Sequence, residues 1–451
     1  MCIRDRLFLV ILSADFCKAS DKCLRIEENR IASKQVCFSS SDTIYTIDKV
    51  IDLDGRILKL PDNCVLRFDG GVILNGTVIF NNTRIQDPCF RNVRFEGNIK
   101  NETFNISDYG AIAGSDMDCS VVINDLIKLQ SSSIPSRSAK TIVIPNGTFY
   151  IDNPIVLWAG WEAPVTLQGN GNTSTLCQRR DNVNIIRLYE NHYIKNLKLI
   201  YKNRQILENS GSVAIACQRS IFSLFENLTI CKAKSAFGYI PLNDQKKGWN
   251  PTRIKDQCYV SCNFRNIRIY EFSGYAFDFS KEFPQGDSGS AFDNVYINSN
   301  DWLGRTTDNK SLGAIKGDNT VASMTQLNIE GSHYSSNLID LSGMSRVSIQ
   351  SLHIEGIKNM PIIIKNSIQS LANISMMDIQ FCNFTVDNYV AFLSEDDALI
   401  TIGNFCVRND CKKNSNAILM TKRKTTNSHN ITIEYSIAVS YTHLRAHETS
   451  A

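Results

Sequence analysis

The stretch Phe225-Glu-Asn-Leu-Thr-Ile230 decides the fold, because its pattern F-x-N-L-x-I recurs along the chain. Each copy carries two apolar residues two positions apart, as at Leu228 and Ile230, and this alternation predicts a strand with one buried face. Repeats spaced about 25–40 residues apart are typical of a solenoid whose coils cover one another. The pattern therefore predicts an all-β chain, a right-handed parallel β-helix. The copies begin at Ile194, Phe225, Phe264, Phe292, Met324, Ile349 and Ile374.

The repeat also predicts how the coils stack. Its first apolar position after the bend should form one interior column, made of Leu228, Ile267, Val295, Leu327 and Leu352. Its third position is Asn196, Asn227, Asn266 and Asn294 in the first four copies, and then Gln326, Ser351 and Met376. Asparagine repeated at one bend suggests a ladder in which each amide bonds the turn of the next coil.

Composition excludes some classes of protein. The chain has 451 residues and a formal net charge of only +3, which argues against a general nucleic-acid or membrane surface. Its 15 cysteines are scattered and form no C-x-x-C pair, so we expect buried thiols and no metal site.

Both ends of the sequence are set apart from the fold. Residues 1–20 and 437–451 contain Met1–Arg6 and Ser440–Ser450, which resemble translated adapter sequence from assembled metagenomic reads. Leu7–Leu12 looks like the remnant of a bacterial signal peptide and is too short to span a membrane. We therefore expect a secreted, periplasmic or cell-surface protein.

Residues 21–103 contain short strands and turns, and predict an N-terminal β-rich module. The next region, 104–436, opens with Asp108-Tyr-Gly-Ala111, followed by a short helix over Val121–Leu129. Then come the strand segment Thr141–Ile151 and Val165–Gly171, which ends in an L-x-G-x-G turn. This order resembles the opening of the pectate-lyase-like superfamily, which includes phage tailspikes and polygalacturonase-type enzymes. The resemblance covers roughly 104–400. It implies the β-helix and a site in the groove along one row of strands.

The resemblance leaves the activity open, because the superfamily includes hydrolases, lyases, epimerases and non-catalytic adhesins. Polygalacturonases carry N-T-D, D-D, G-H-G and R-I-K in that order; here Arg253-Ile-Lys255 stands without the motifs that should precede it, and Gly-His-Gly is absent. Neither the acidic calcium cluster nor the R-x-P-x-x-R element of pectate lyases is found.

A second strand in each coil places charged residues outward. Alternation points Asp278, Lys316 and Asp340 to solvent on three successive coils. At a strand spacing of about 4.8 Å, the two carboxylates are roughly 9–10 Å apart, with Lys316 between them. This separation suits an inverting glycosidase, and Lys316 would keep one carboxylate ionised. The alternative is a surface ladder that neutralises itself.

Two further pairs follow from the repeat. Glu330 and Glu355 both end the text Leu-x-Ile-Glu-Gly one coil apart, so their carboxylates could stack at about 5 Å, as in a retaining pair. The alternative is a turn that favours Glu before Gly. His353 and Asp378 occupy equivalent outward positions and could bond, on another face.

Three long loops, Pro241–Gln257, Lys281–Ser290 and Asn298–Ser311, are expected to flank the groove. Aromatic rings stack on sugars, and basic side chains recognise uronate carboxylates. The alternative is loops that only cover the coil edge. Candidate substrate-binding residues are Lys246, Trp249, Arg253, Asp287, Trp302 and Arg305.

These observations favour a secreted glycoside hydrolase that acts on an acidic, uronate-containing polysaccharide. A polysaccharide lyase and a non-catalytic tailspike-like binding protein are the alternatives. No cofactor is expected, except Ca²⁺ if the protein is a lyase. No nucleic-acid partner is expected, and no trimerisation motif supports the homotrimer common among tailspikes.

Overall fold

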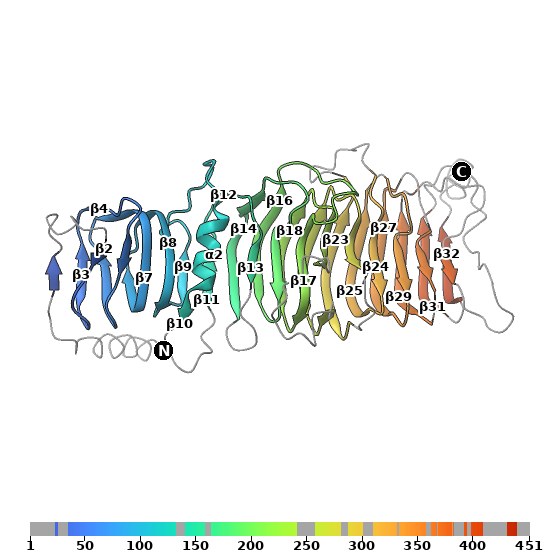
Figure 1. The fold of residues 1–451 in the computed structure, drawn as a ribbon. Coiled ribbons are helices and arrows are strands. Elements are labelled where there is room, and N and C mark those ends of the chain that lie inside the picture. The colour runs from blue at the N-terminus through green and yellow to red at the C-terminus, as the bar shows by residue number, and fades with distance from the viewer. Residues whose placement is uncertain are drawn as a thin grey trace, which may run out of the picture. The chain divides into compact units, whose positions relative to one another are not determined.

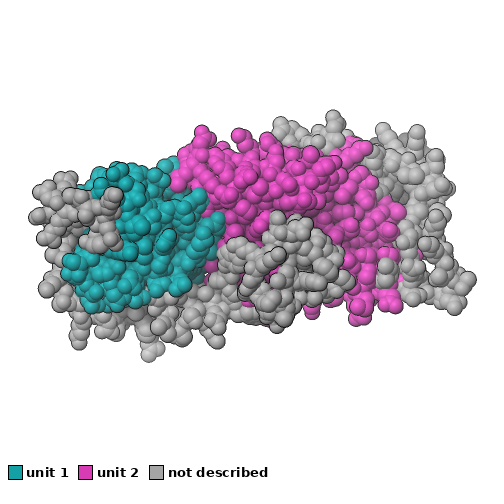
Figure 2. Space-filling model, viewed as in Figure 1, with its two compact units in different colours: residues 1–112, 121–143 teal, residues 113–120, 144–451 magenta. Residues whose placement is uncertain are grey.

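The computed structural model describes residues 23–25, 35–131, 140–157, 164–240, 258–280, 287–300, 310–331, 333–357, 362–367, 369–380, 382, 392–394, 398–408 and 431–439. The chain divides into two compact units (Figure 2). Unit 1 is residues 1–112 with 121–143, and unit 2 is residues 113–120 with 144–451. The sequence placed the boundary at 103/104, whereas strands up to residue 143 group with unit 1 in the structure.

Unit 1 is built from parallel strands and most of one helix. β3, β6 and β7 pair in parallel, and so do β5, β7 and β8. The helix α2 spans Ser120–Lys128, close to the helix predicted at 121–129. The elements are β1 Cys23–Arg25, β2 Gln35–Cys37, β3 Ile44–Ile47, β4 Val50–Asp52, β5 Ile57–Lys59, β6 Val65–Phe68, β7 Val72–Gln86, β8 Phe90–Ile99, β9 Thr103–Asn105, α2, β10 Gln130–Ser131 and β11 Lys140–Val143.

Unit 2 is the predicted right-handed parallel β-helix, and its coils repeat a long strand and a short strand (Figure 1). The long strands pair in parallel in one sheet: β12 Gly147–Ile151, β14 Val165–Gln178, β16 Tyr193–Tyr201, β18 Leu224–Cys231, β21 Asn263–Tyr270, β23 Ser290–Asn298, β25 Val321–Glu330, β27 Arg346–Glu355, β29 Leu371–Gln380, β31 Leu399–Arg408 and β32 Ile431–Val439. The short strands form a second sheet: β13 Ile155–Leu157, β15 Ile186–Tyr189, β17 Val213–Ile221, β19 Ser235–Tyr239, β20 Cys258–Val260, β22 Tyr275–Phe279, β24 Gly313–Asp318, β26 Ile339–Ser342, β28 Ile364–Asn366 and β30 Phe392–Ser394.

The interior column predicted by the repeat is confirmed. Leu228, Ile267, Val295, Leu327 and Leu352 are direct register partners from one coil to the next. Each is at most 1% exposed. Alternation of side chains along a strand, combined with covering by the neighbouring coils, is enough to produce this core.

Aromatic residues stack in the same register. The rings of Phe225 and Phe264 are 4.8 Å apart, and those of Phe264 and Phe292 are 4.3 Å apart and nearly parallel. On the short strands, Phe237 stacks on Phe277 at 5.2 Å. Of the ten cysteines that the structure describes as free, eight are buried.

The asparagines form a ladder at the bend, and its hydrogen bonds join one side-chain amide to the next. Asn294 donates to Asn266 at 2.9 Å, Asn266 to Asn227 at 2.9 Å, and Asn227 to Asn196 at 2.8 Å. The sequence predicted that each amide bonds the turn of the next coil, and the structure shows that the partner in that turn is the asparagine side chain. All four residues have φ between 52° and 54°, a left-handed conformation that asparagine tolerates.

The bend changes where the asparagines end. Gln326 and Ser351 pair directly as register partners, and so do Ser351 and Met376, so the strand runs through this position without a left-handed residue. Asparagine adopts the left-handed region far more readily than Gln, Ser or Met does, which explains the change.

Candidate functional site

The charged residues predicted on the short strands lie in one row. Asp278 on β22 is the register partner of Lys316 on β24, and Lys316 is the partner of Asp340 on β26. Asp340 is in turn paired with Lys365 on β28. All four side chains are half-buried. The structure thus places an Asp–Lys–Asp–Lys row on one face, which we call the Asp row.

The two carboxylates of the Asp row have different neighbours. Asp278 accepts hydrogen bonds from the backbone N–H of Ser280, at 3.1 Å, and from its hydroxyl. Asp340 accepts one from the amide of Asn337 at 3.1 Å. Among the described residues, Lys316 forms no ion pair with either carboxylate. Its Nζ lies 5.9 Å from the centre of the Tyr275 ring instead.

Tyr275 belongs to this site, although the sequence did not single it out. It is 4% exposed, and its hydroxyl donates to Ser336 Oγ at 3.1 Å. Burial raises the pKa of Tyr275 to about 12, and the negative charges of Asp340 and Asp278 act in the same direction. The phenol therefore stays protonated at neutral pH and can donate a hydrogen bond.

Gly313 makes the space for that ring. A Cβ at this position would lie 2.1 Å from the carbonyl oxygen of Asn337 and 2.4 Å from a ring carbon of Tyr275. Alternation along β22 places Tyr275 on the same inward side as Phe277. The sequence pattern therefore predicts a core residue and does not predict its contact with the Asp row. Lys365 could have been found from the sequence, because it continues the outward alternation.

The Glu330 and Glu355 pair lies on the long strands β25 and β27, so it is on a different sheet from the Asp row. The two residues are direct register partners, as their identical local sequences predict. Glu330 accepts a 2.5 Å hydrogen bond from the Tyr296 hydroxyl and one at 3.4 Å from Asn298. Burial, and then the bond to Glu330, raise the pKa of Tyr296, so this phenol is the donor.

His353 links two carboxylates beside this pair. Its Nε2 lies 3.1 Å from Glu355, and its Nδ1 lies 3.4 Å from Asp378 on the next coil. The predicted His353–Asp378 register is present. Each acidic side chain here thus has a protein partner, which favours a structural role for this cluster.

Asp287 differs from its expected role as an exposed substrate contact. It is 3% exposed and accepts from the Tyr239 hydroxyl at 2.8 Å, from the backbone N–H of Tyr259 at 2.7 Å and from Thr320 at 3.1 Å. A buried carboxylate with several donors is a structural group, and here it links Tyr239, Tyr259 and Thr320. Lys246, Trp249, Arg253, Trp302 and Arg305 lie outside the described residues.

No group of three or more His, Cys, Asp or Glu side chains is arranged to hold a metal ion in the part of the chain that the structure describes. Over the same residues, no helix has the length and apolar character that crossing a bilayer requires.

Comparison with known families agrees with the sequence resemblance. Residues 103–266 match the family model described as Rhamnogalacturonase A/epimerase, pectate lyase-like. This segment is pectate-lyase-like. It contains the four opening motifs and the first coils of the β-helix up to Asn266. No curated protein sequence matches the chain.

Solved structures that match the chain come from two viruses and from a bacterium. A tailspike of an Acinetobacter phage has 9% identity and a TM-score of 0.46, over 75% of this chain and 58% of that one. A protein of Geobacillus virus E2 has 11% identity and a TM-score of 0.38, over 64% and 59%. The A-module of an Azotobacter vinelandii mannuronan C-5 epimerase has 10% identity and a TM-score of 0.37, over 75% and 99%. The chain thus spans less than two thirds of the two viral proteins.

Proposed function

We propose that this protein is secreted, binds an acidic polysaccharide along the Asp row and hydrolyses it. The observation that supports this is the register of Asp278, Lys316 and Asp340 on three adjacent strands. Two steps of about 4.8 Å separate the two aspartates by roughly 9–10 Å along the backbone, which leaves room for a sugar and a water.

The neighbours of each carboxylate suggest its role. Ser280 donates two hydrogen bonds to Asp278, and these fix the orientation of its carboxylate. Asp278 therefore suits the base that removes a proton from the attacking water. Asp340 suits the acid that protonates the leaving oxygen, and the reaction would invert the configuration at the sugar carbon.

Lys316 supports substrate binding in this proposal. With no ion pair to either aspartate among the described residues, its ammonium group is available to the carboxylate of a uronate unit. Tyr275 lies under Lys316 and keeps its proton, so it can hold the ammonium over its ring.

A polysaccharide lyase is the second candidate, and the contact between Lys316 and Tyr275 favours it. A lysine in such a site can remove a proton next to a uronate carboxylate, and a protonated tyrosine can donate to the leaving oxygen. Lys316 would then be essential and the two aspartates would not.

Replacing Asp340 with Asn tests the hydrolase. We expect turnover to fall at least about a hundredfold, the usual scale for losing a general acid. Asp54→Asn is the control, because Asp54 is exposed, lies in unit 1 and has a positive φ that asparagine tolerates. Polygalacturonate and a panel of other uronate polymers are the substrates, and new reducing ends are measured together with near-ultraviolet absorbance.

The products separate the three functions. A hydrolase releases reducing ends without an unsaturated end that absorbs in the near ultraviolet, and a lyase releases both. A binding protein releases neither. Full activity of Asp340→Asn would rule out the Asp row as the hydrolytic site and move the chemistry to Glu330 and Glu355 or to another part of the chain.

A further inference from the structure

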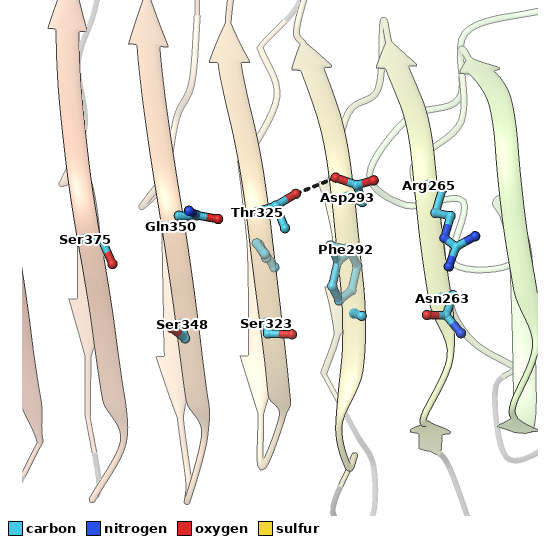
Figure 3. Close-up of a pocket in the computed structure, with 11 residues that line it drawn as sticks. Asn263, Arg265, Phe292, Asp293, Ser323, Thr325, Ser348, Gln350 and Ser375 are labelled. Atoms are coloured by element: carbon cyan, nitrogen blue, oxygen red, sulfur yellow. Dashed lines mark hydrogen bonds between the residues drawn. The ribbon is translucent and has the colours of Figure 1, made fainter.

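A hollow lies on the outer face of the long strands, away from the sheet that carries the Asp row. Its volume is about 460 Å³, and it crosses β21, β23, β25, β27 and β29 (Figure 3). We call it the β21–β29 groove. Its polar lining includes Asn263, Arg265, Ser323, Ser348, Gln350 and Ser375.

The groove follows from alternation and from side-chain size. Phe292 and Met324 point into the coil and are at most 4% exposed, so their neighbours along the strands point outward. Ser323 and Ser348 are register partners on adjacent strands, and both are short. A run of small outward side chains leaves a hollow where longer ones would fill the face.

Apart from Asp293 and Thr325, which bond to each other, the polar side chains that line the groove have no hydrogen-bond partner among the described residues. Within the described residues, the side chains of Arg265, Gln350 and Ser348 form no hydrogen bond or ion pair. The same is true of Asn263, Ser323 and Ser375 in that part of the chain. This differs from the neighbouring face, where the asparagine ladder and the Tyr296–Glu330 bond occupy the polar groups.

Arg265 forms no ion pair in the groove with any described residue. Its register partner is Asp293, but the Asp293 carboxylate accepts a 2.5 Å bond from Thr325 on the other side. Figure 3 shows Asp293 directed toward Thr325 and the Arg265 guanidinium directed toward Asn263. Arg265 therefore presents an unpaired fork of N–H donors that matches a carboxylate.

We propose that the β21–β29 groove is a second, non-catalytic binding site for an acidic glycan. A uronate carboxylate would bind Arg265, and sugar hydroxyls would bond to Ser348, Gln350 and the other short side chains. Strands about 4.8 Å apart repeat these donors and acceptors along the groove, which suits a polymer of similar units. The volume lies within the usual range of about 300–1,000 Å³ for ligand sites. The inference rests on the proposed polysaccharide ligand and not on cleavage at the Asp row.

Titration calorimetry with a galacturonate hexasaccharide tests the proposal. All proteins carry Asp340→Asn, so that the ligand is not consumed. The groove variants are Arg265→Gln, which removes the charge, and Ser348→Trp, which fills the hollow. The controls are Arg180→Gln and Ser210→Trp, because both residues are exposed in unit 2 and outside the groove. Circular dichroism confirms that each variant is folded.

We expect the parent to bind at two sites, and Ser348→Trp to remove one of them. Arg265→Gln should weaken that site about tenfold or more, because a hydrogen bond to a charged group contributes about 1.5–3 kcal/mol and each 1.4 kcal/mol is tenfold. The controls should bind as the parent does, and a neutral maltohexaose should bind the groove more weakly.

Three results would overturn the inference. If both groove variants bind with the affinity and stoichiometry of the parent, the groove binds no glycan. If maltohexaose binds the groove as tightly as the galacturonate hexasaccharide does, the groove does not select an acidic ligand. A dimer in sedimentation that Ser348→Trp dissociates would assign the groove to a second copy of the chain. Loss of turnover in Asp340→Asn, measured separately on the polymer, tests the proposed hydrolysis whatever the groove does.

Discussion

Replacing Asn266 separates the two physical effects that hold the bend of the coil. Asn266 accepts a 2.9 Å bond from Asn294 and donates a 2.9 Å bond to Asn227, and its φ is 52°. Asn266→Gly removes both bonds but keeps the left-handed backbone. Asn266→Ala removes both bonds and also places a Cβ in the left-handed region.

The expected losses follow from these contacts. The ladder is exposed, so each lost bond is at the low end of the usual range, about 0.5 kcal/mol, and the two together are about 1 kcal/mol. Alanine in the left-handed region adds about 1–2 kcal/mol. We therefore expect the free energy of unfolding to fall by about 2–3 kcal/mol in Asn266→Ala. The loss in Asn266→Gly should be smaller, even when the greater freedom that glycine gives the unfolded chain is included.

Urea denaturation followed by circular dichroism measures both losses, with the slope checked for constancy. Gln326→Ala is the matched control: Gln326 occupies the same repeat position one coil beyond Asn294 and does not have a positive φ. Its loss should be below about 0.5 kcal/mol. A glycine variant less stable than the alanine variant, or losses equal to that of the control, would refute this account of the bend.

Two further predictions concern buried positions and are also tested by urea denaturation. His192 is fully buried, and its Nδ1 accepts a hydrogen bond from the backbone N–H of Val165. Burial lowers the pKa of His192 from 6.5 to about 4. Its contribution to the free energy of unfolding is therefore fully present above pH 6.5, and about 3 kcal/mol of it should be lost as the pH falls toward 4. His192→Asn should flatten this pH dependence, and an unchanged profile would contradict the assignment. Gly313→Ala should destabilise by about 1–3 kcal/mol, because its Cβ would overlap backbone and ring atoms. Gly317→Ala, whose nearest contact is a leucine methyl at 3.0 Å, should cost less, and equal losses would argue against that overlap.

Much of the fold could be predicted from the sequence, because in a solenoid a residue packs against the residues at the same repeat position in the neighbouring coils. The period-two pattern at Leu228 and Ile230 sets which face is buried, and the repeat sets which residue of the next coil covers it. The register of Asp278, Lys316 and Asp340 follows from the same rule. A shift by one residue would expose the apolar set, so the register is strongly determined.

The partner of each polar side chain was decided only by the tertiary structure. Asp287 lies in a stretch that reads as a surface loop, yet Tyr239 and Thr320, from distant parts of the chain, surround it with donors. Tyr275 has the alternation of a core residue, and only the three-dimensional arrangement brings its ring under Lys316. Hydrogen bonds depend on distances of a few tenths of an ångström, which a pattern of residue types does not specify.

The asparagine ladder and the β21–β29 groove show the same division. The sequence determined that Asn227 and Asn266 share a bend, because they occupy one position of a repeat. The structure decided that their amides bond to each other, since the left-handed bend points both side chains outward. The sequence likewise determined that Ser348 and Arg265 face solvent, but only the packing of five adjacent strands makes their face a hollow with an unpaired charge. Side-chain direction is a local property of a strand, whereas a cavity depends on the sizes of all the neighbours at once.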